Sequence, residues 1–296
     1  MTRFYGILPA VVTPVDDYGR FLPSSFEQLL ERLYSTGVHG IYVCGQTGEG
    51  LALPVCDRKA AAEAAVRNSP PGAQVVVHVG SHRTEDAIEL ARHAGRAGAH
   101  AVSSLPPSGA YSFKEVREYY HAVAAAGDLP FLVYFFPDIC PAIRGLDEIL
   151  ELCSLPNVIG LKFTDFNLFH LDRIKRGGFT LYNGRDEILA GGLLFGADGG
   201  IGTFYNLVPD LFVEIFEAAR AGDWPCAMEA QQRINELIEV VLRFPALAAV
   251  KRMLTWSGIP CGDPLAPRLP MNGAEERRLI QALDATSFAG APFTRP

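Results

Sequence analysis

The chain has 296 residues, of which 49% are hydrophobic, and a formal net charge of −7. This length and apolar content allow one large core, and the acidic balance argues against nucleic acid or an anionic membrane as the main partner. No apolar stretch approaches the ~20 residues of a membrane span, the start has no signal-peptide layout, and the six cysteines show no metal-like clustering with histidine, so a cytoplasmic protein with reduced thiols is expected.

Short apolar runs alternate with amphipathic helical stretches along most of the chain. The expected strands are residues 6–13, 40–44, 74–79, 101–105, 131–135, 158–163, 180–182 and 199–204. The clearest helices between them are residues 24–36, 57–68, 84–97, 113–126, 146–153 and 207–221. Ser24 and Glu27 form the pattern of a capping box, and Thr84 before two acidic residues favours a helix start. Gly37 and Gly98 follow helical runs, as helix stops do.

Eight strands that alternate with helices predict an α/β fold, a (β/α)8 TIM barrel. A doubly wound open sheet is the alternative, but no Gly-x-Gly-x-x-Gly follows the first strand. After residue 221 only helices are expected, at 224–243, 245–257 and 274–285. Because no flexible linker precedes them, we expect residues 1–222 to form the barrel and residues 223–296 a helical extension packed on it, as one structural unit.

Lys162 lies at the end of the sixth expected strand, in an apolar run that is typical of a strand buried on both faces. Lysine is rarely buried without a reason. An amine in an apolar slot has its charged form disfavoured, which frees the neutral nucleophile that a Schiff base requires. Taken alone, the segment also fits a strand-end lysine whose stem packs while its ammonium reaches water.

The active site of such a barrel lies at the carboxyl ends of its strands. The Gly-flanked Thr47 offers backbone N–H groups and a hydroxyl to a carboxylate, although a tight turn explains it equally. Tyr134 ends the fifth strand, where it can move protons near Lys162 or simply pack in the core. The acidic pair at 186–187 fits a ligand site or a helix start.

Several motifs carry a family resemblance that covers nearly the whole chain. They are Gly-x-Thr-Gly-Glu at 45–49, the tyrosine-to-proline turn at 134–137, Gly-Leu-Lys at 160–162, Tyr-Asn-Gly-Arg-Asp-Glu at 182–187 and Gly-Ala-Asp-Gly-Gly-Ile-Gly at 196–202. The chain resembles the pyruvate-dependent class I aldolase family that contains N-acetylneuraminate lyase and dihydrodipicolinate synthase. It looks most like the N-acetylneuraminate lyase branch, because residues 137–141 lack the arginine usual in the dihydrodipicolinate synthase branch.

The resemblance implies a lyase or aldolase that makes or breaks a C–C bond between pyruvate and an aldehyde. Lys162 would form an imine with the 2-oxo acid, Tyr134 would move protons, and no metal or organic cofactor would be needed. The carboxylate would be bound by Gln46, Thr47 and Gly48. The polyhydroxylated tail of a sugar acid such as N-acetylneuraminate would be bound by Thr164, Gly184, Asp186, Glu187 and Thr203.

Two departures from the family pattern leave alternatives open. Gln46 stands where a serine or threonine is usual, and an amide cannot relay a proton as a hydroxyl does. The loop at 105–111 is shorter than the lyase pattern, and its Tyr111 is the one candidate for a relay tyrosine from a neighbouring subunit of the homotetramer that the family implies. The alternatives are a 2-keto-3-deoxy sugar acid aldolase or dehydratase, a dihydrodipicolinate synthase-like enzyme, and a catalytically weakened barrel that binds 2-oxo acids or has a regulatory role.

Overall fold

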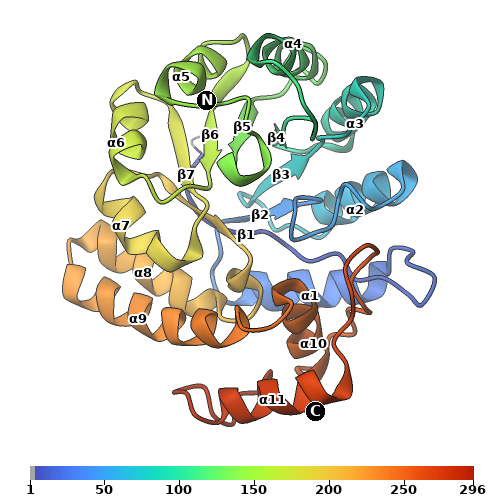
Figure 1. Ribbon diagram of the computed structural model, residues 1–296, viewed down its shortest axis with the longest axis vertical. Coiled ribbons are helices and arrows are strands. Elements are labelled where there is room, and N and C mark those ends of the chain that lie inside the picture. The colour runs from blue at the N-terminus through green and yellow to red at the C-terminus, as the bar shows by residue number, and fades with distance from the viewer. Residues whose placement is uncertain (1–3) are drawn as a thin grey trace.

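Eight parallel strands form a ring at the centre of the computed structural model, which describes residues 4–296 (Figure 1). In chain order the strands are β1 (Gly6–Pro9), β2 (Gly40–Val43), β3 (Gln74–His78), β4 (Ala101–Ser104), β5 (Phe131–Phe135), β6 (Val158–Phe163), β7 (Thr180–Asn183) and β8 (Gly199–Gly202). From β2 to β8 each strand pairs with the next one along the chain, and β1 pairs with β8. The Val11 N–H closes the ring by donating to the Tyr42 carbonyl at 2.9 Å.

A helix follows each strand and covers the outside of the ring (Figure 1). These helices are α1 (Pro23–Ser35), α2 (Val55–Arg67), α3 (Thr84–Ala97), α4 (Phe113–Ala124), α5 (Leu146–Cys153), α6 (Leu168–Arg176), α7 (Leu189–Leu194) and α8 (Pro209–Ala221). Short 3-10 turns follow three strands: η1 (Pro137–Ile139), η2 (Asp186–Ile188) and η3 (Phe204–Asn206). The architecture confirms the predicted (β/α)8 barrel, and the predicted barrel's first three residues lie outside the described part.

Three further helices complete the chain: α9 (Trp224–Val241), α10 (Ala246–Trp256) and α11 (Gly273–Leu283). Helix α9 runs beside α8, and α10 and α11 lie next to the α1 side of the ring (Figure 1). Gly222 adopts a left-handed φ of 78° between α8 and α9, and the Asp223 side chain caps α9. A two-residue connection leaves α9 little freedom to move away from α8.

The predicted helix ends were confirmed where the backbone requires a particular conformation. Helix α3 begins at Thr84 with two acidic residues in its first turn, and Gly37 and Gly98 have left-handed φ values of 86° and 91° beyond helix ends. The prediction that Ser24 caps the first helix was wrong. Helix α1 starts one residue earlier, at Pro23, because the fixed φ of proline suits a first helical position. Helices α6 and α7 gave weaker signals, α7 because it contains two glycines.

The buried side chains form two layers, one inside the ring and one between the ring and its helices. The interior layer consists of Phe4, Leu8, Ala10, Tyr42, Val76, Ala101, Leu105, Leu132, Tyr134, Tyr182 and Ile201. Because side chains alternate along a strand, Lys162 shares the inward parity of its register partners Tyr134 and Tyr182. None of the helices among residues 4–296 has the length and apolar character of a bilayer span.

Candidate active site

Lys162 and Tyr134 meet inside the barrel, at the carboxyl end of β6 and β5. Their Cα atoms are paired in the strand register, and Lys162 is only 4% exposed. The Lys162 Nζ donates to the Tyr134 Oη at 3.0 Å and lies 4.1 Å from the centroid of that ring. The buried amine is thereby hydrogen-bonded to the Tyr134 phenol, within the reach of a direct proton transfer.

Two residues that sequence reasoning missed complete the surroundings of this pair. The Tyr42 ring centroid lies 5.0 Å from the Lys162 Nζ, and the Tyr42 Oη donates to the Ser103 Oγ. His78 packs edge-on against Tyr134, with ring centroids 6.2 Å apart. Both belong to the inward-facing set of positions that includes Lys162. A polar or titratable residue at the inward parity near a strand's carboxyl end was the signal that could have found them.

His78 is held in its neutral form by its surroundings. Its Nε2 accepts from the Leu105 N–H at 3.0 Å, a role that a protonated nitrogen cannot play. Burial, reinforced by Arg58 and Lys162, holds the pKa of His78 well below its usual range. The imidazole therefore adds no positive charge to the neighbourhood of Lys162, and it anchors the segment that follows β4.

The Gly45–Gly50 loop after β2 turns back on itself because glycine allows close backbone approach. A Cβ on Gly50 would lie 1.8 Å from the Cys44 carbonyl oxygen, and Cys44 itself has a left-handed φ of 58°. The Gly48 carbonyl accepts from the Thr13 hydroxyl at 2.7 Å. The buried Thr47 hydroxyl is 2.7 Å from that of Thr203, which follows β8. The two predicted binding hydroxyls are thus joined directly.

Asp186 supports the Thr203 segment rather than facing open solvent. The Asp186 Oδ2 accepts from the Phe204 N–H at 2.7 Å. A Cβ on Gly202 would lie 1.9 Å from the Asp186 Oδ1, so glycine makes room for this carboxyl group. Burial, with a smaller contribution from the nearby Glu187 charge, raises the pKa of Asp186 to about 7. Glu187 is half-buried at the start of the same turn.

Thr164 and Gly184 are neighbours across the ends of β6 and β7. A Cβ on Gly184 would lie 2.1 Å from the Thr164 Oγ1, so a larger residue would displace the threonine. Among residues 4–296 no partner accepts from or donates to this buried hydroxyl. An unpaired buried hydroxyl costs free energy, and a bound hydroxylated ligand would remove that cost.

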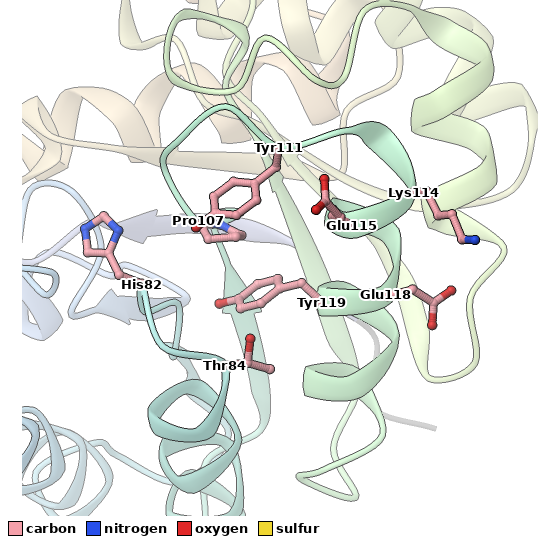
Figure 2. A pocket seen from close by; sticks show the side chains of 8 residues that line it. All are labelled: His82, Thr84, Pro107, Tyr111, Lys114, Glu115, Glu118 and Tyr119. Atoms are coloured by element: carbon pink, nitrogen blue, oxygen red, sulfur yellow. The ribbon is translucent and has the colours of Figure 1, made fainter.

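Gln46 and Tyr111 are the two departures from the family pattern, and they lie in different places. Gln46 is half-buried beside Thr47 in the Gly45–Gly50 loop. Tyr111 instead lines a pocket of about 580 Å³ between the starts of α3 and α4, as Figure 2 shows. The lining residues are His82, Thr84, Pro107, Tyr111, Lys114, Glu115, Glu118 and Tyr119. Lys162 is not among them, so within one chain Tyr111 belongs to another pocket, and its relay role stays a prediction.

Arg185 reaches across the mouth of the barrel, a position that the sequence did not indicate. Its guanidinium carbon lies 4.5 Å from the Phe166 ring centroid and 5.2 Å from that of Phe136. An Nη2 hydrogen bond of 2.8 Å to Asp138 completes this bridge between the segments after β5, β6 and β7.

Among the residues described, no group of three or more histidine, cysteine, aspartate or glutamate side chains is arranged to hold a metal ion.

Comparisons with known proteins agree with one another over nearly the whole chain. A family model described as the dihydrodipicolinate synthetase family matches residues 3–286. N-acetylneuraminate lyase 2 of Escherichia coli O6:H1 is 35% identical over 273 residues, which cover 90% of each chain. N-acetylneuraminate lyase of Rhizobium meliloti is 33% identical over 290 residues, 96% of this chain and 95% of the relative. The solved structure of Ruminococcus gnavus sialic acid aldolase superposes with a TM-score of 0.89 at 27% identity, covering 94% of this chain and 95% of that one.

Proposed function

The chain belongs to the dihydrodipicolinate synthetase family. From that premise we propose that it is a pyruvate-dependent lyase that acts on a sugar acid of the N-acetylneuraminate type through a Schiff base at Lys162. The observation that carries the proposal is the 3.0 Å contact between the Lys162 Nζ and the Tyr134 Oη inside the barrel. Two N-acetylneuraminate lyases at 33–35% identity support the substrate class.

The proposed reaction begins when the Lys162 Nζ attacks the ketone carbon of the 2-oxo acid. The oxygen leaves as water and an iminium remains, with Tyr134 supplying and removing protons. A base takes the proton of the hydroxyl on C4, and we assign Tyr134 to this step. The bond between C3 and C4 then breaks, C4 becomes an aldehyde, and the electron pair moves into the iminium as an enamine. Protonation of the enamine and hydrolysis release pyruvate and restore Lys162.

Substrate positioning is proposed for the loops around this pair. The backbone N–H groups of Gln46, Thr47 and Gly48, together with the Thr47 hydroxyl, would bind the carboxylate. Thr164 is proposed to bind the sugar tail, because its buried hydroxyl has no hydrogen-bond partner among the described residues. Gly184, which leaves room for this hydroxyl, is proposed to line the same part of the site. The same tail would be bound by Asp186, Glu187 and Thr203.

We also propose that the enzyme needs no metal or organic cofactor and works as a cytoplasmic homotetramer. The imine itself is the electron sink, so the chemistry requires no other one. All six cysteines are free thiols, which suits a reducing compartment. Light scattering coupled to size-exclusion chromatography measures the assembly, and a chelator that leaves turnover unchanged supports the absence of a metal.

A trapping experiment tests the proposed function. Borohydride reduction with pyruvate should add one pyruvate-derived group to Lys162, and Lys162→Ala should abolish the adduct. Coupled pyruvate-release assays with N-acetylneuraminate and 2-keto-3-deoxygluconate then identify the tail. An adduct on another lysine, or none, would exclude Lys162 as the nucleophile. Faster release from 2-keto-3-deoxygluconate would favour the alternative substrate, to which Gln46 would have adapted the pocket.

A further inference from the structure

Glu49 ends the Gly-x-Thr-Gly-Glu motif, yet it faces away from the proposed substrate and into the protein. Its carboxylate is completely buried, and its Oε2 accepts from the Lys251 Nζ at 3.0 Å. Lys251 lies on α10 of the helical extension, 202 residues later, and its side chain is 1% exposed. The end of the substrate loop is therefore joined to a helix outside the barrel.

Each member of this pair has a further partner in the same segment of the extension. The Glu49 Oε1 accepts from the Leu265 N–H at 2.7 Å. The Lys251 Nζ also donates to the Asp263 carbonyl at 2.9 Å. One carboxylate and one ammonium thus connect the Gly45–Gly50 loop, α10 and the stretch from Asp263 to Leu265. Buried charges require such satisfied partners.

Stability alone is a weak explanation for this arrangement. Desolvating two charges costs about as much as their attraction returns, and apolar replacements are often as stable. Glu49 also has a left-handed φ of 53°, which is uncommon for a residue other than glycine. Its N–H donates to the Gln46 carbonyl at 3.2 Å and closes the turn that contains Thr47. A backbone outlier held by its surroundings beside a site is a reason to consider a functional constraint.

We infer that Glu49 and Lys251 are positioning residues: their ion pair fixes the 46–48 backbone so that its N–H groups converge on the carboxylate of the 2-oxo acid. The inference rests on the proposed function and adds a role for the helical extension. The extension is then part of the catalytic unit, because it supplies the cation that holds the substrate loop. Neither side chain touches the reacting atoms, and both act through the Thr47 turn.

The neighbouring Arg252 offers a matched control on the same helix. Its guanidinium pairs with Asp263 and Glu276 near the surface, so it contributes two ion pairs to the extension without contacting the Gly45–Gly50 loop. Glu49→Gln, Lys251→Met and Arg252→Met are compared with the wild type. Borohydride trapping is measured against pyruvate concentration, which gives a half-saturating concentration and a limiting rate independent of the aldehyde.

We expect Glu49→Gln and Lys251→Met to raise the half-saturating pyruvate concentration about 10- to 100-fold, with a smaller change in the limiting rate, because displaced N–H groups bind the carboxylate poorly. Arg252→Met should leave both values within about twofold. If a single variant fails to fold, the double variant Glu49→Gln/Lys251→Met, which buries no unpaired charge, should show the same rise. Wild-type half-saturation in folded variants, even with a lower melting temperature, would overturn the positioning role.

Hydrogen exchange separates this inference from the proposed function, because it requires no reaction. Amides of residues 46–48 should exchange at least about tenfold faster in Glu49→Gln and Lys251→Met than in Arg252→Met, since loss of the anchor lets the turn open locally. Unchanged exchange there would overturn the inference even if pyruvate is trapped. If the wild type traps no pyruvate but both variants exchange faster than Arg252→Met, the anchor would stand and the lyase would be rejected.

Discussion

The hydroxyls of Thr47 and Thr203 lie 2.7 Å apart although 156 residues separate them in the chain. One follows β2 and the other follows β8, so the contact crosses the mouth of the barrel beside β1. We expect Thr47→Val and Thr203→Val each to raise the half-saturating pyruvate concentration. The loss of pyruvate-binding free energy in the double variant should be smaller than the sum of the two single losses by about 0.5–1.5 kcal/mol, because each single change already breaks the shared hydrogen bond. Strict additivity in this cycle would mean that the hydroxyls act separately.

Tyr134→Phe should separate imine formation from proton transfer. The change removes the Oη that lies 3.0 Å from the Lys162 Nζ but keeps the ring that packs against it. Turnover should fall about 10²- to 10⁴-fold, while slow trapping at Lys162 persists. Tyr42→Phe is the matched control, because the Tyr42 Oη bonds to Ser103 instead. Equal losses in the two variants would contradict a special role for the Tyr134 hydroxyl.

Gly184→Ala should change selectivity for the sugar tail more than it changes pyruvate binding. The added Cβ would lie 2.1 Å from the Thr164 Oγ1, so the threonine must move. We expect kcat/KM for a long sugar acid to fall about tenfold or more, with little change in pyruvate trapping. Gly273→Ala is the control, because its Cβ would meet nothing closer than 3.6 Å. A parallel loss of trapping would place Gly184 closer to the imine than proposed.

Asp186 should make stability depend on pH in an identifiable way. Its pKa is raised from 3.8 to about 7, so between these values the folded state binds more protons than the unfolded state. The destabilisation from burying the carboxylate is therefore fully present above pH 7 and is relieved as pH falls toward 4. Asp186→Asn removes this dependence. From pH 5 to pH 8 its free energy of unfolding should rise relative to wild type by about 2–3 kcal/mol.

Thermal or urea unfolding of the two proteins at several pH values measures this difference. A constant difference would show that Asp186 is already ionised at pH 5. The same variant keeps an oxygen that can accept from the Phe204 N–H, so the Thr203 segment should stay in place.

Gln46→Ser should increase turnover if the amide limits the proton relay. A hydroxyl donates and accepts a proton, whereas a glutamine amide supplies only hydrogen bonds, and we expect kcat to rise at least about tenfold. Gln46→Asn tests pocket size without adding a hydroxyl. High wild-type turnover of one sugar acid, lowered by Gln46→Ser, would instead show that Gln46 is suited to that substrate.

The sequence by itself determined the barrel and indicated Lys162 as the candidate nucleophile. Eight apolar runs alternating with helical stretches leave few other ways to bury both faces of parallel strands. The inward parity of Tyr134 and Lys162 follows from the period of two within each strand. The helix ends at Gly37 and Gly98 could also be predicted, because a left-handed backbone favours glycine whatever surrounds it. The strand-period and glycine signals are local, because each depends on a few consecutive residues, and the alternation of strands and helices repeats such local signals along the chain.

Only the tertiary structure decided which distant groups meet. The Ser24 capping box was a sound local pattern, but Pro23 started the helix instead. No spacing links Thr47 to Thr203 or Glu49 to Lys251, because ring closure and the packing of α10 bring them together. The acidity of Asp186 is likewise set by burial behind Gly202 and not by its sequence neighbours alone. Contacts between distant residues and the desolvation of buried groups depend on the whole fold, so they could not be predicted from the local sequence.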